Sequence, residues 1–260
     1  MRDADNFSDA SPTAPPLGAA ASFAVLGGST VTSTGLSVVN GNLGVWPGFA
    51  VNGFPPGVVI GGTIDQGGQP SANAQAALTP LYNTLAGMPC NTDMTSIDLS
   101  GKTLGPGVYC FASSAAITTT GTLTLDAGGN PNAAWVFQIG STLTTSNGSA
   151  VNVINGGSAC NVFWQVGSSA TIGTTNVFGG NIVAFAAITV QTGSSVSGRL
   201  LAQTGAVTLD ANAVAFATCG SIPGDAALDV DDGDSSSDAD SSSDADSSSD
   251  ADSGDAPDGG

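Results

Sequence analysis

The stretch from Trp135 to Ser146, W-V-F-Q-I-G-S-T-L-T-T-S, decides the fold class. It combines an apolar run, a corner of small residues, and a second run in which an aliphatic residue lies between a small residue and threonine. The same order recurs in segments that begin at Phe23, Val162, Ile182 and Leu200. Short runs with a period of two, separated by Gly, Ser and Asn, are typical of β-strands. Their repetition along the chain predicts a β-solenoid, in which each turn stacks on another.

A third short run closes each turn of the predicted solenoid. These runs share an alternation of apolar and polar residues, and they are residues 121–128, 148–155, 175–180, 194–199 and 211–216. Three strands per turn imply a roughly triangular cross-section. Because the turns differ in length, we predict a mainly β chain that forms an irregular three-faced (triangular) β-solenoid.

One long α-helix is predicted over about residues 70–87 and is expected to pack alongside the solenoid. Its apolar residues fall on a single helical face. They are Ala74, Ala77, Leu78, Leu81, Tyr82 and Leu85. Pro70 suits the first turn and Gly87 suits the end, whereas Pro80 lies inside the helix and predicts a bend. The helix separates an N-terminal set of strands (residues 23–65) from a C-terminal set (residues 96–216).

The formal net charge of −18 is concentrated at the ends of the 260-residue chain. Residues 225–260 carry −13 and residues 1–16 carry −2, whereas residues 17–224 carry only −3. The sequence S-S-S-D-A-D occurs three times in succession after Gly233-Asp234, a composition too polar to bury a core. We therefore predict a disordered leader (1–16), one folded domain (17–224) and a disordered acidic Ser/Asp spacer (225–260).

Composition argues against several classes of function. The chain has no His and only three cations. Without His there is no Ser-His-Asp triad and no His metal site, and C-x-x-C spacing is absent, so neither a metal nor a cofactor is predicted. Three cations cannot neutralise a phosphate backbone, which argues against nucleic acid. No apolar run reaches the roughly 18 residues of a membrane span, so direct membrane insertion is not expected. The five aspartates of residues 17–224 are scattered, and we predict that the chain is not an enzyme.

The second strand of each turn supplies the candidate functional residues. We align these strands on one inward-facing aliphatic residue, namely Val31, Ile117, Leu143, Ile172, Ile188 and Val207. Because side chains alternate across a strand, their neighbours point outward. The candidate binding residues are Thr30, Thr32, Thr118, Thr142, Thr144, Thr171, Gly173, Ala187, Thr189, Ala206 and Thr208. They predict a flat grid of methyl and hydroxyl groups that is almost free of charge.

This grid has a simple interpretation, because threonine is common on exposed strands. A more specific interpretation is recognition of a regular, uncharged, hydrogen-bonding surface such as ice. Rigidly spaced groups with few rotamers suit that task, because little conformational freedom is lost on binding. The alternative is a surface polysaccharide-binding or adhesive module. Sugar-binding faces usually present aromatic rings, and Trp135, Phe163 and Trp164 lie in the first strands, outside the threonine columns.

Residues 17–219 resemble the microbial ice-binding proteins that have a discontinuous β-solenoid and one flanking helix. The resemblance rests on several motifs together, including LGAAASFAVLGGSTVT, GNLGVWPG, AQAALTPLYNTLAG, LTLDAGGNPNAAWVFQIGSTLTT, CNVFWQVGSSATIGT and NIVAFAAITVQTG. It implies binding of ice crystals through one flat solenoid face, freezing-point hysteresis and inhibition of ice recrystallisation. Pro80 in the helix, and Gly173 and Asp210 on the predicted face, depart from that pattern. We expect the ice crystal surface to be the partner of a monomeric protein.

The four cysteines allow three pairings. We favour Cys90–Cys110, which would pin the end of the helix to a strand, and Cys160–Cys219, which would fasten the last turn to an earlier one. Free buried thiols are the alternative. An even number of cysteines favours an oxidising compartment. We therefore expect an extracellular protein, either secreted or tethered at the cell surface.

Overall fold

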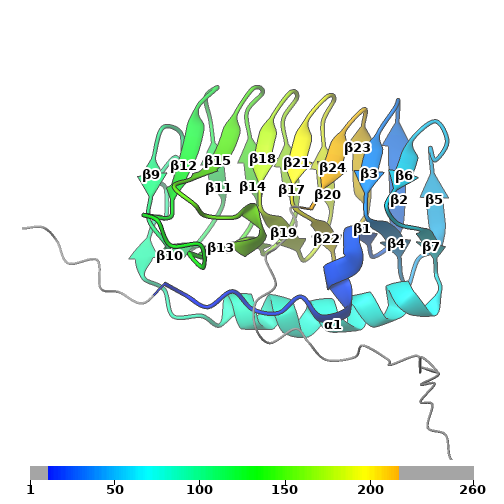
Figure 1. The fold of residues 1–260 in the computed structure, drawn as a ribbon, viewed down its shortest axis with the longest axis horizontal. Helices are drawn as coiled ribbons and strands as arrows, with labels where there is room; N and C mark the ends of the chain where they lie inside the picture. Colours follow the sequence, from blue (N-terminus) through cyan, green and yellow to red (C-terminus); the bar gives the residue numbers. More distant parts are fainter. Residues whose placement is uncertain (1–10, 217–260) are drawn as a thin grey trace, which may run out of the picture. The chain divides into compact units, whose positions relative to one another are not determined.

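Three parallel sheets wind around one core in the computed structural model, which describes residues 11–216 (Figure 1). Sheet A has nine strands, in the order β7 (Ile64–Gln66), β4 (Asn42–Val45), β1 (Phe23–Gly27), β22 (Leu200–Ala202), β19 (Asn181–Ala184), β16 (Val162–Val166), β13 (Trp135–Ile139), β10 (Gly107–Phe111) and β8 (Thr92–Asp93). Sheet B has seven strands, in the order β11 (Ala115–Ile117), β14 (Leu143–Thr145), β17 (Ala170–Ile172), β20 (Ile188–Val190), β23 (Val207–Asp210), β2 (Thr30–Thr34) and β5 (Ala50–Asn52). Sheet C has eight strands, in the order β6 (Val58–Ile60), β3 (Val38–Asn40), β24 (Ala213–Ala215), β21 (Ser195–Ser197), β18 (Val177–Gly179), β15 (Ala150–Ile154), β12 (Thr122–Asp126) and β9 (Thr103–Leu104). The predicted mainly β, three-faced solenoid with one helix is confirmed.

The N-terminal turn stacks on the last turn of the solenoid, far from it in sequence. β1 pairs with β22, β2 with β23 and β3 with β24, so that Val31 lies opposite Val207. The two strand sets are therefore joined in mid-stack, and β7 and β8 lie at opposite ends of sheet A. The chain must travel the length of that sheet between them. The helix α1 (Gln69–Ala86) makes this connection.

Helix α1 lies along sheet A (Figure 1). Its 18 residues rise about 27 Å, whereas nine strands span about 38 Å, and residues 87–91 cover the remainder. At its start, the backbone N–H of Ser71 donates to Oδ2 of Asp65 over 2.6 Å, which places a carboxylate at the positive end of the helix dipole. The helix agrees with its predicted bounds to within one residue. It continues through exposed Pro80, where the expected bend stays a prediction.

Aromatic rings stack through the interior of the solenoid, three of them from neighbouring strands of sheet A and the fourth from sheet C. The rings of Phe137 and Trp164 lie 3.9 Å apart at 8°, and Tyr109 and Phe178 extend the row at its two ends. Nε1 of Trp164 also donates to the carbonyl of Gly179 over 3.1 Å. Parallel in-register pairing of β13 with β16 brings these rings together, because it places equivalent residues directly beside one another.

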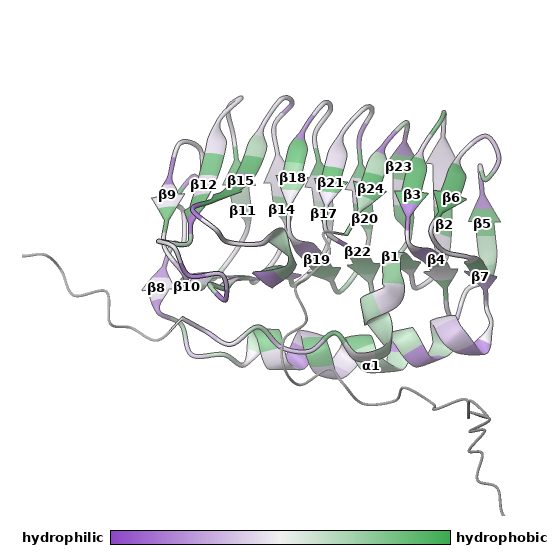
Figure 2. Cartoon of the chain, viewed as in Figure 1, coloured by the Kyte–Doolittle hydropathy of each residue, from purple (hydrophilic) through white to green (hydrophobic). Residues whose placement is uncertain are grey.

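A second hydrophobic cluster lies between sheet A and α1. Leu78, Leu81 and Leu85 of the helix pack with outward residues of the sheet such as Val136 and Phe163. Sheet A is thus covered on both faces, which explains why its strands are continuous apolar runs rather than alternating ones. Figure 2 shows the hydrophobic residues of α1 interrupted by hydrophilic ones, as expected of a helix with one buried face.

Residues 11–16, at the start of the described part of the chain, pack on the folded domain. The leader predicted over residues 1–16 is too long, because residues 11–16 pack on the domain: Pro15 is buried, and Oγ of Ser11 accepts the N–H of Ala134 over 3.1 Å. Residues 1–10 and 217–260, which include the spacer and the end of the predicted domain, lie outside the described residues.

The Cys90–Cys110 disulfide is confirmed. It joins the segment after α1 to strand β10 of sheet A, which agrees with its expected role at the end of the helix. Cys160 is buried and disulfide-bonded, and its expected partner, Cys219, lies outside the described residues.

The aromatic row predicts a large penalty for truncating its central ring. Trp164→Ala should lower the free energy of unfolding by about 3–5 kcal/mol, because it removes a fully buried ring and leaves a cavity. Phe49→Ala is the control: this side chain is 75% exposed, and its loss should cost less than about 0.5 kcal/mol. Urea unfolding followed by circular dichroism measures both. Equal losses in the two variants would contradict this description of the core.

Candidate functional site

Sheet B is one of two solenoid faces that α1 leaves uncovered. Its strand register aligns the outward side chains in columns across the turns. The central column consists of Ala116, Thr144, Thr171, Thr189, Thr208, Thr32 and Asn52. Threonine therefore occupies five consecutive positions, separated by the distance between neighbouring strands, about 4.8 Å. All five side chains are exposed or half-buried.

Two flanking columns complete the face. The column that precedes the central one contains Ser114, Thr142, Ser169, Ala187, Ala206, Thr30 and Ala50, as backbone hydrogen bonds between the turns show. Within it, the hydroxyls of Ser114 and Thr142 lie 2.8 Å apart. The column that follows the central one contains Thr118, Asp210 and Thr34. The structure thus brings together all the predicted site residues except Gly173.

The predicted alignment of the second strands is wrong by two residues in β11 and β17. Leu143 lies opposite Ala115 and Ala170, not opposite Ile117 and Ile172. Each of these two strands points two aliphatic residues inward, and the smaller of the two, not the larger, aligns with Leu143. The correct register moves Thr171 into the central column, beside Thr144.

Gly173 is the predicted site residue that this correction removes from the face. It is buried at the corner after β17, where its N–H donates to Oγ1 of Thr145 over 3.0 Å. A Cβ atom at this position would lie 2.7 Å from the carbonyl oxygen of Thr145, so only glycine fits. Gly173 therefore serves the turn between sheets B and C.

Sequence reasoning missed the strand β5, which adds Ala50 and Asn52 to the face. The segment Ala50-Val51-Asn52 has the same small–aliphatic–polar order as the other second strands, and this signal could have identified it. Its pairing with β2 extends the face by one turn beyond the threonine column.

Two carboxylates mark the margins of sheet B, and each binds threonine hydroxyls. Oδ2 of Asp98 accepts the hydroxyl of Thr118 beside β11. Asp210 accepts the hydroxyls of Thr192 and Thr34, the latter over 2.9 Å. The predicted site residue Thr118 therefore has its hydroxyl bound to a charged group at one end of the sheet.

The hydroxyls of the central column are used differently. Oγ1 of Thr32 lies 3.4 Å from Oγ1 of Thr208, a long hydrogen bond. The hydroxyls of Thr144, Thr171 and Thr189 have no protein partner in residues 11–216. These three groups, at the centre of the face, are thus free to bind an external hydrogen-bonding partner.

Hydrogen bonding keeps both marginal carboxylates ionised. Desolvation would raise the pKa of Asp98, but hydrogen bonds from Thr118 and Ser100 outweigh it and lower the pKa to about 2. Hydrogen bonds from Thr192 and Thr34 lower the pKa of Asp210 as well. The negative charges of the face are therefore fixed at its margins over the ordinary pH range.

Sheet C, the other uncovered face, is chemically less regular. Its outward side chains include the exposed branched residues Val58, Ile60 and Val177, small residues such as Ser197, and the charged Asp126. No residue type repeats along one of its columns as threonine does on sheet B. Sheet B is therefore the chemically more regular of the two uncovered faces.

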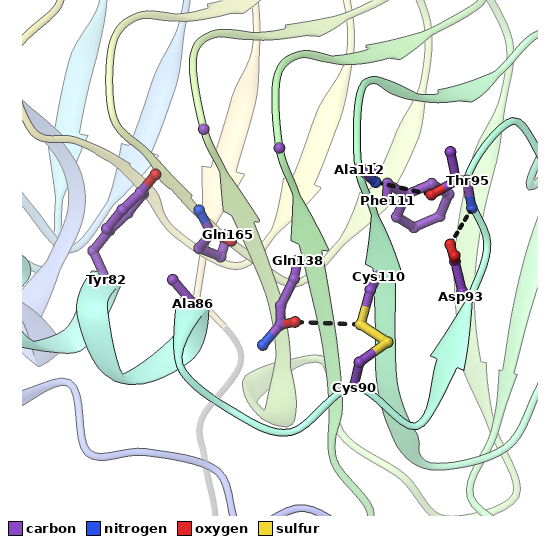
Figure 3. A pocket seen from close by; sticks show the side chains of 12 residues that line it. Tyr82, Ala86, Cys90, Asp93, Thr95, Cys110, Phe111, Ala112, Gln138 and Gln165 are labelled. Carbon is purple, nitrogen blue, oxygen red and sulfur yellow. Dashed lines mark hydrogen bonds between the residues drawn. A yellow bond between two sulfur atoms is a disulfide. The ribbon is translucent and has the colours of Figure 1, made fainter.

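A shallow hollow lies away from both faces, where the end of α1 meets sheet A (Figure 3). Tyr82, Asp93, Gln138 and Gln165 line it together with the Cys90–Cys110 disulfide. Nε2 of Gln138 donates to the carbonyls at the end of the helix, a structural contact. A single carboxylate without a basic partner offers no general acid–base pair here.

Neither a cluster of metal ligands nor a membrane-spanning helix occurs in the described part of the chain. Within residues 11–216, no group of three or more His, Cys, Asp or Glu side chains is arranged to hold a metal ion. The same residues contain no helix with the length and apolarity needed to cross a bilayer.

Comparison with known proteins agrees with this geometry. Residues 25–215, which span all three sheets, match the family described as ice-binding-like. The chain belongs to the ice-binding-like family. Among its relatives, the ice-binding protein of Nostoc sp. (strain HG1) is 52% identical over 221 residues, covering 85% of this chain and 80% of that protein.

Solved structures of ice-binding proteins share the fold. An ice-binding protein from an Antarctic biological consortium superposes with a TM-score of 0.76 and 41% identity, covering 79% of this chain and 92% of that one. An ice-binding protein from the ascomycete Antarctomyces psychrotrophicus has a TM-score of 0.73 and 39% identity, covering 78% and 98%.

The lowered pKa of Asp98 predicts how stability changes in acid. Because this pKa is below the unfolded value of 3.8, the stabilisation is complete above pH 3.8 and is lost as the pH falls through about 2. The melting temperature should therefore decline over that window, and Asp98→Asn should reduce the decline. Differential scanning calorimetry between about pH 8 and 2 measures this. An identical acid profile in the two proteins would contradict the assignment.

Proposed function

We propose that this protein adsorbs to ice crystals through sheet B, and thereby produces thermal hysteresis and inhibits ice recrystallisation. The observation that carries the proposal is the column of five threonines on consecutive strands. The family and the names of its relatives support the same function.

The chemistry of the column suits an ordered water surface. Each threonine presents a methyl group beside a hydroxyl, and its branched side chain has few rotamers on a strand. The methyl groups limit the positions that water molecules can occupy on the face. The free hydroxyls bind some of these water molecules by hydrogen bonds. Water ordered in this way can merge with the ice lattice. Ice growth between bound molecules then becomes curved, which is unfavourable.

Rigidity allows many weak contacts to act together. The threonines are fixed by the backbone ladder of sheet B, so little conformational entropy is lost when ice is bound. Fixed charges would hold disordered hydration shells, and here Asp98 and Asp210 are confined to the margins. Adsorption of this kind needs no catalytic group, which fits a protein that is not an enzyme.

The remaining elements of the proposal concern where and how the protein acts. A single chain carries the complete face, so a monomer suffices. The Cys90–Cys110 disulfide fits an oxidising, extracellular setting, which is where a protein would come into contact with external ice. The acidic residues 225–260 are proposed as a spacer outside the ice-binding unit.

A polysaccharide-binding or adhesive module is the rival function. Trp135, Phe163 and Trp164 are buried and cannot stack on a sugar ring. The exposed aromatic residues Trp46 and Phe49 lie at the corner before β5, at one end of sheet B. Phe185, also exposed, lies at the corner between β19 and β20, where its ring is 6.3 Å from that of Tyr82 on α1, and not in the columns of sheet B. Nothing on the extended face therefore favours a sugar chain over ice.

A bulky residue at the centre of the column should separate the face from ice. Thr189→Tyr is expected to remove most of the thermal hysteresis, because the ring would hold neighbouring threonines away from a flat crystal. The free energy of unfolding should change by less than about 0.5 kcal/mol, since the position faces solvent. Nanolitre osmometry and a recrystallisation assay measure the activity.

Ser197→Tyr is the matched control. Ser197 is an exposed residue of β21, the strand that follows β20 along the chain, but this strand belongs to sheet C. This variant should keep full activity. Loss in the Ser197 variant with retention in the Thr189 variant would move the ice-binding surface to sheet C. A folded wild-type protein without any hysteresis or recrystallisation effect would refute the proposed function.

A further inference from the structure

Buried polar side chains form a continuous row beneath the corner between sheets B and C. Each is less than a tenth exposed, although serine and asparagine are usually found at the surface. We call this row the B–C ladder. It consists of Ser149, Thr145, Asn176, Ser194, Asn212, Ser37 and Ser33.

Asn176 joins three turns of the solenoid. Its Nδ2 donates to Oγ1 of Thr145, and its Oδ1 accepts the N–H of Ser149 over 2.9 Å. On its other side, the N–H of Asn176 donates to Oγ of Ser194 over 2.9 Å. That hydroxyl donates in turn to the carbonyl of Gly173 over 2.6 Å. Both polar groups of the Asn176 side chain thus bind the corner of the preceding turn, and its backbone N–H binds the following turn through Ser194.

Asn212 occupies a corresponding corner further along the stack and also binds more than one turn. Its Nδ2 donates to the carbonyl of Gln191 over 2.8 Å, and its Oδ1 accepts the N–H of Asp210 over 2.6 Å. Its backbone N–H donates to Oγ of Ser37 over 3.1 Å. Because Ser37 belongs to the N-terminal strand set, this contact carries the ladder across the junction between the two strand sets.

The ladder holds the residues that follow the threonine column. Thr145 comes directly after Thr144, Gln191 is two residues after Thr189, and Asp210 is two residues after Thr208. At the corner the regular strand pairing ends, so the carbonyl of Gln191 and the N–H of Asp210 bind the side chain of Asn212, whereas the side-chain hydroxyl of Thr145 binds Asn176. A buried donor or acceptor that is left without a hydrogen-bond partner destabilises the fold. The ladder side chains supply these partners and so fix one edge of sheet B.

We propose that Asn176 and Asn212 are positioning residues for ice binding. They fix the height and spacing of the turns along one edge of the threonine column, so that its hydroxyls and methyl groups lie in one plane. This inference rests on the proposed function. Both asparagines are buried and never touch ice. Their substitution should nevertheless reduce ice-binding activity by more than the loss of folding stability alone would explain.

Asn181 provides a matched control at another corner of the same solenoid. It is fully buried, its Nδ2 donates to the carbonyls of Cys160 and Val162, and its Oδ1 accepts Nη1 of Arg199 over 3.1 Å. Strand β19, which it begins, belongs to sheet A. Asn181→Ala therefore breaks a comparable set of hydrogen bonds away from sheet B.

The experiment compares Asn176→Ala, Asn212→Ala and Asn181→Ala in the full chain. Near 0 °C, circular dichroism establishes that each variant is folded, and thermal hysteresis and amide hydrogen exchange are then measured. Asn176→Ala and Asn212→Ala should lose more than half of the hysteresis and exchange faster in sheet B. Asn181→Ala should lower the melting temperature to a similar extent. It should leave thermal hysteresis and the protection of sheet B amides against exchange unchanged.

Three results decide the outcome. Full hysteresis in both ladder variants would overturn the proposal, and so would an equal loss in Asn181→Ala, since that would make the effect one of general stability. If a ladder asparagine variant does not fold, Ser194→Ala removes one hydroxyl between the two asparagines and carries the same expectation. If wild-type protein shows no hysteresis, the proposed function fails, whereas the exchange comparison still decides whether the ladder fixes sheet B.

Discussion

Parallel, in-register pairing between turns is the constraint on which the rest of this structure depends. It repeats every side chain at the spacing of neighbouring strands, about 4.8 Å. Inside the solenoid this repetition stacks Phe137 on Trp164. Outside, it aligns five threonines in one column. The stacked core and the threonine column of the proposed binding face are therefore two consequences of the same backbone ladder.

The three faces differ because their outward residues meet different surroundings. Sheet A is apolar on both sides and is covered by α1. Sheet C mixes branched, small and charged side chains. Sheet B alone presents a repeated residue type, and its two charges are bound by hydroxyls at the margins. The net charge of −18 thus says little about this face, since most of it belongs to residues 225–260.

The sequence predicts the period of each element well, because amphipathic spacing is a local property. The helix and the turns of three strands follow from local patterns and are confirmed, although strand β5 was missed. The Cys90–Cys110 disulfide, favoured among three possible pairings, is confirmed as well. Register is harder to predict, because β11 and β17 each offer two inward residues. Ala115 and Ala170 hold the position that larger aliphatic residues hold elsewhere, and this misplaced Gly173 on the face.

Long-range contacts are beyond a local interpretation of the sequence. Nothing in the segment around Val31 indicates that it pairs with Val207. The role of the ladder residues is likewise hidden, because Asn176 and Asn212 occur at corners between strands, where asparagine usually indicates a turn. Their burial appears only once the turns are stacked, as does the contact between Asp98 and Thr118.

The central claim is that a flat, threonine-bearing protein surface binds ice directly. Partition of the full chain during slow freezing tests it most directly. A polished ice sphere is grown in a dilute solution of the protein together with a non-binding protein of similar size, and both are assayed in the ice and in the liquid. We predict that the chain becomes concentrated in the ice while the reference protein is excluded. Equal exclusion of the two would contradict the account.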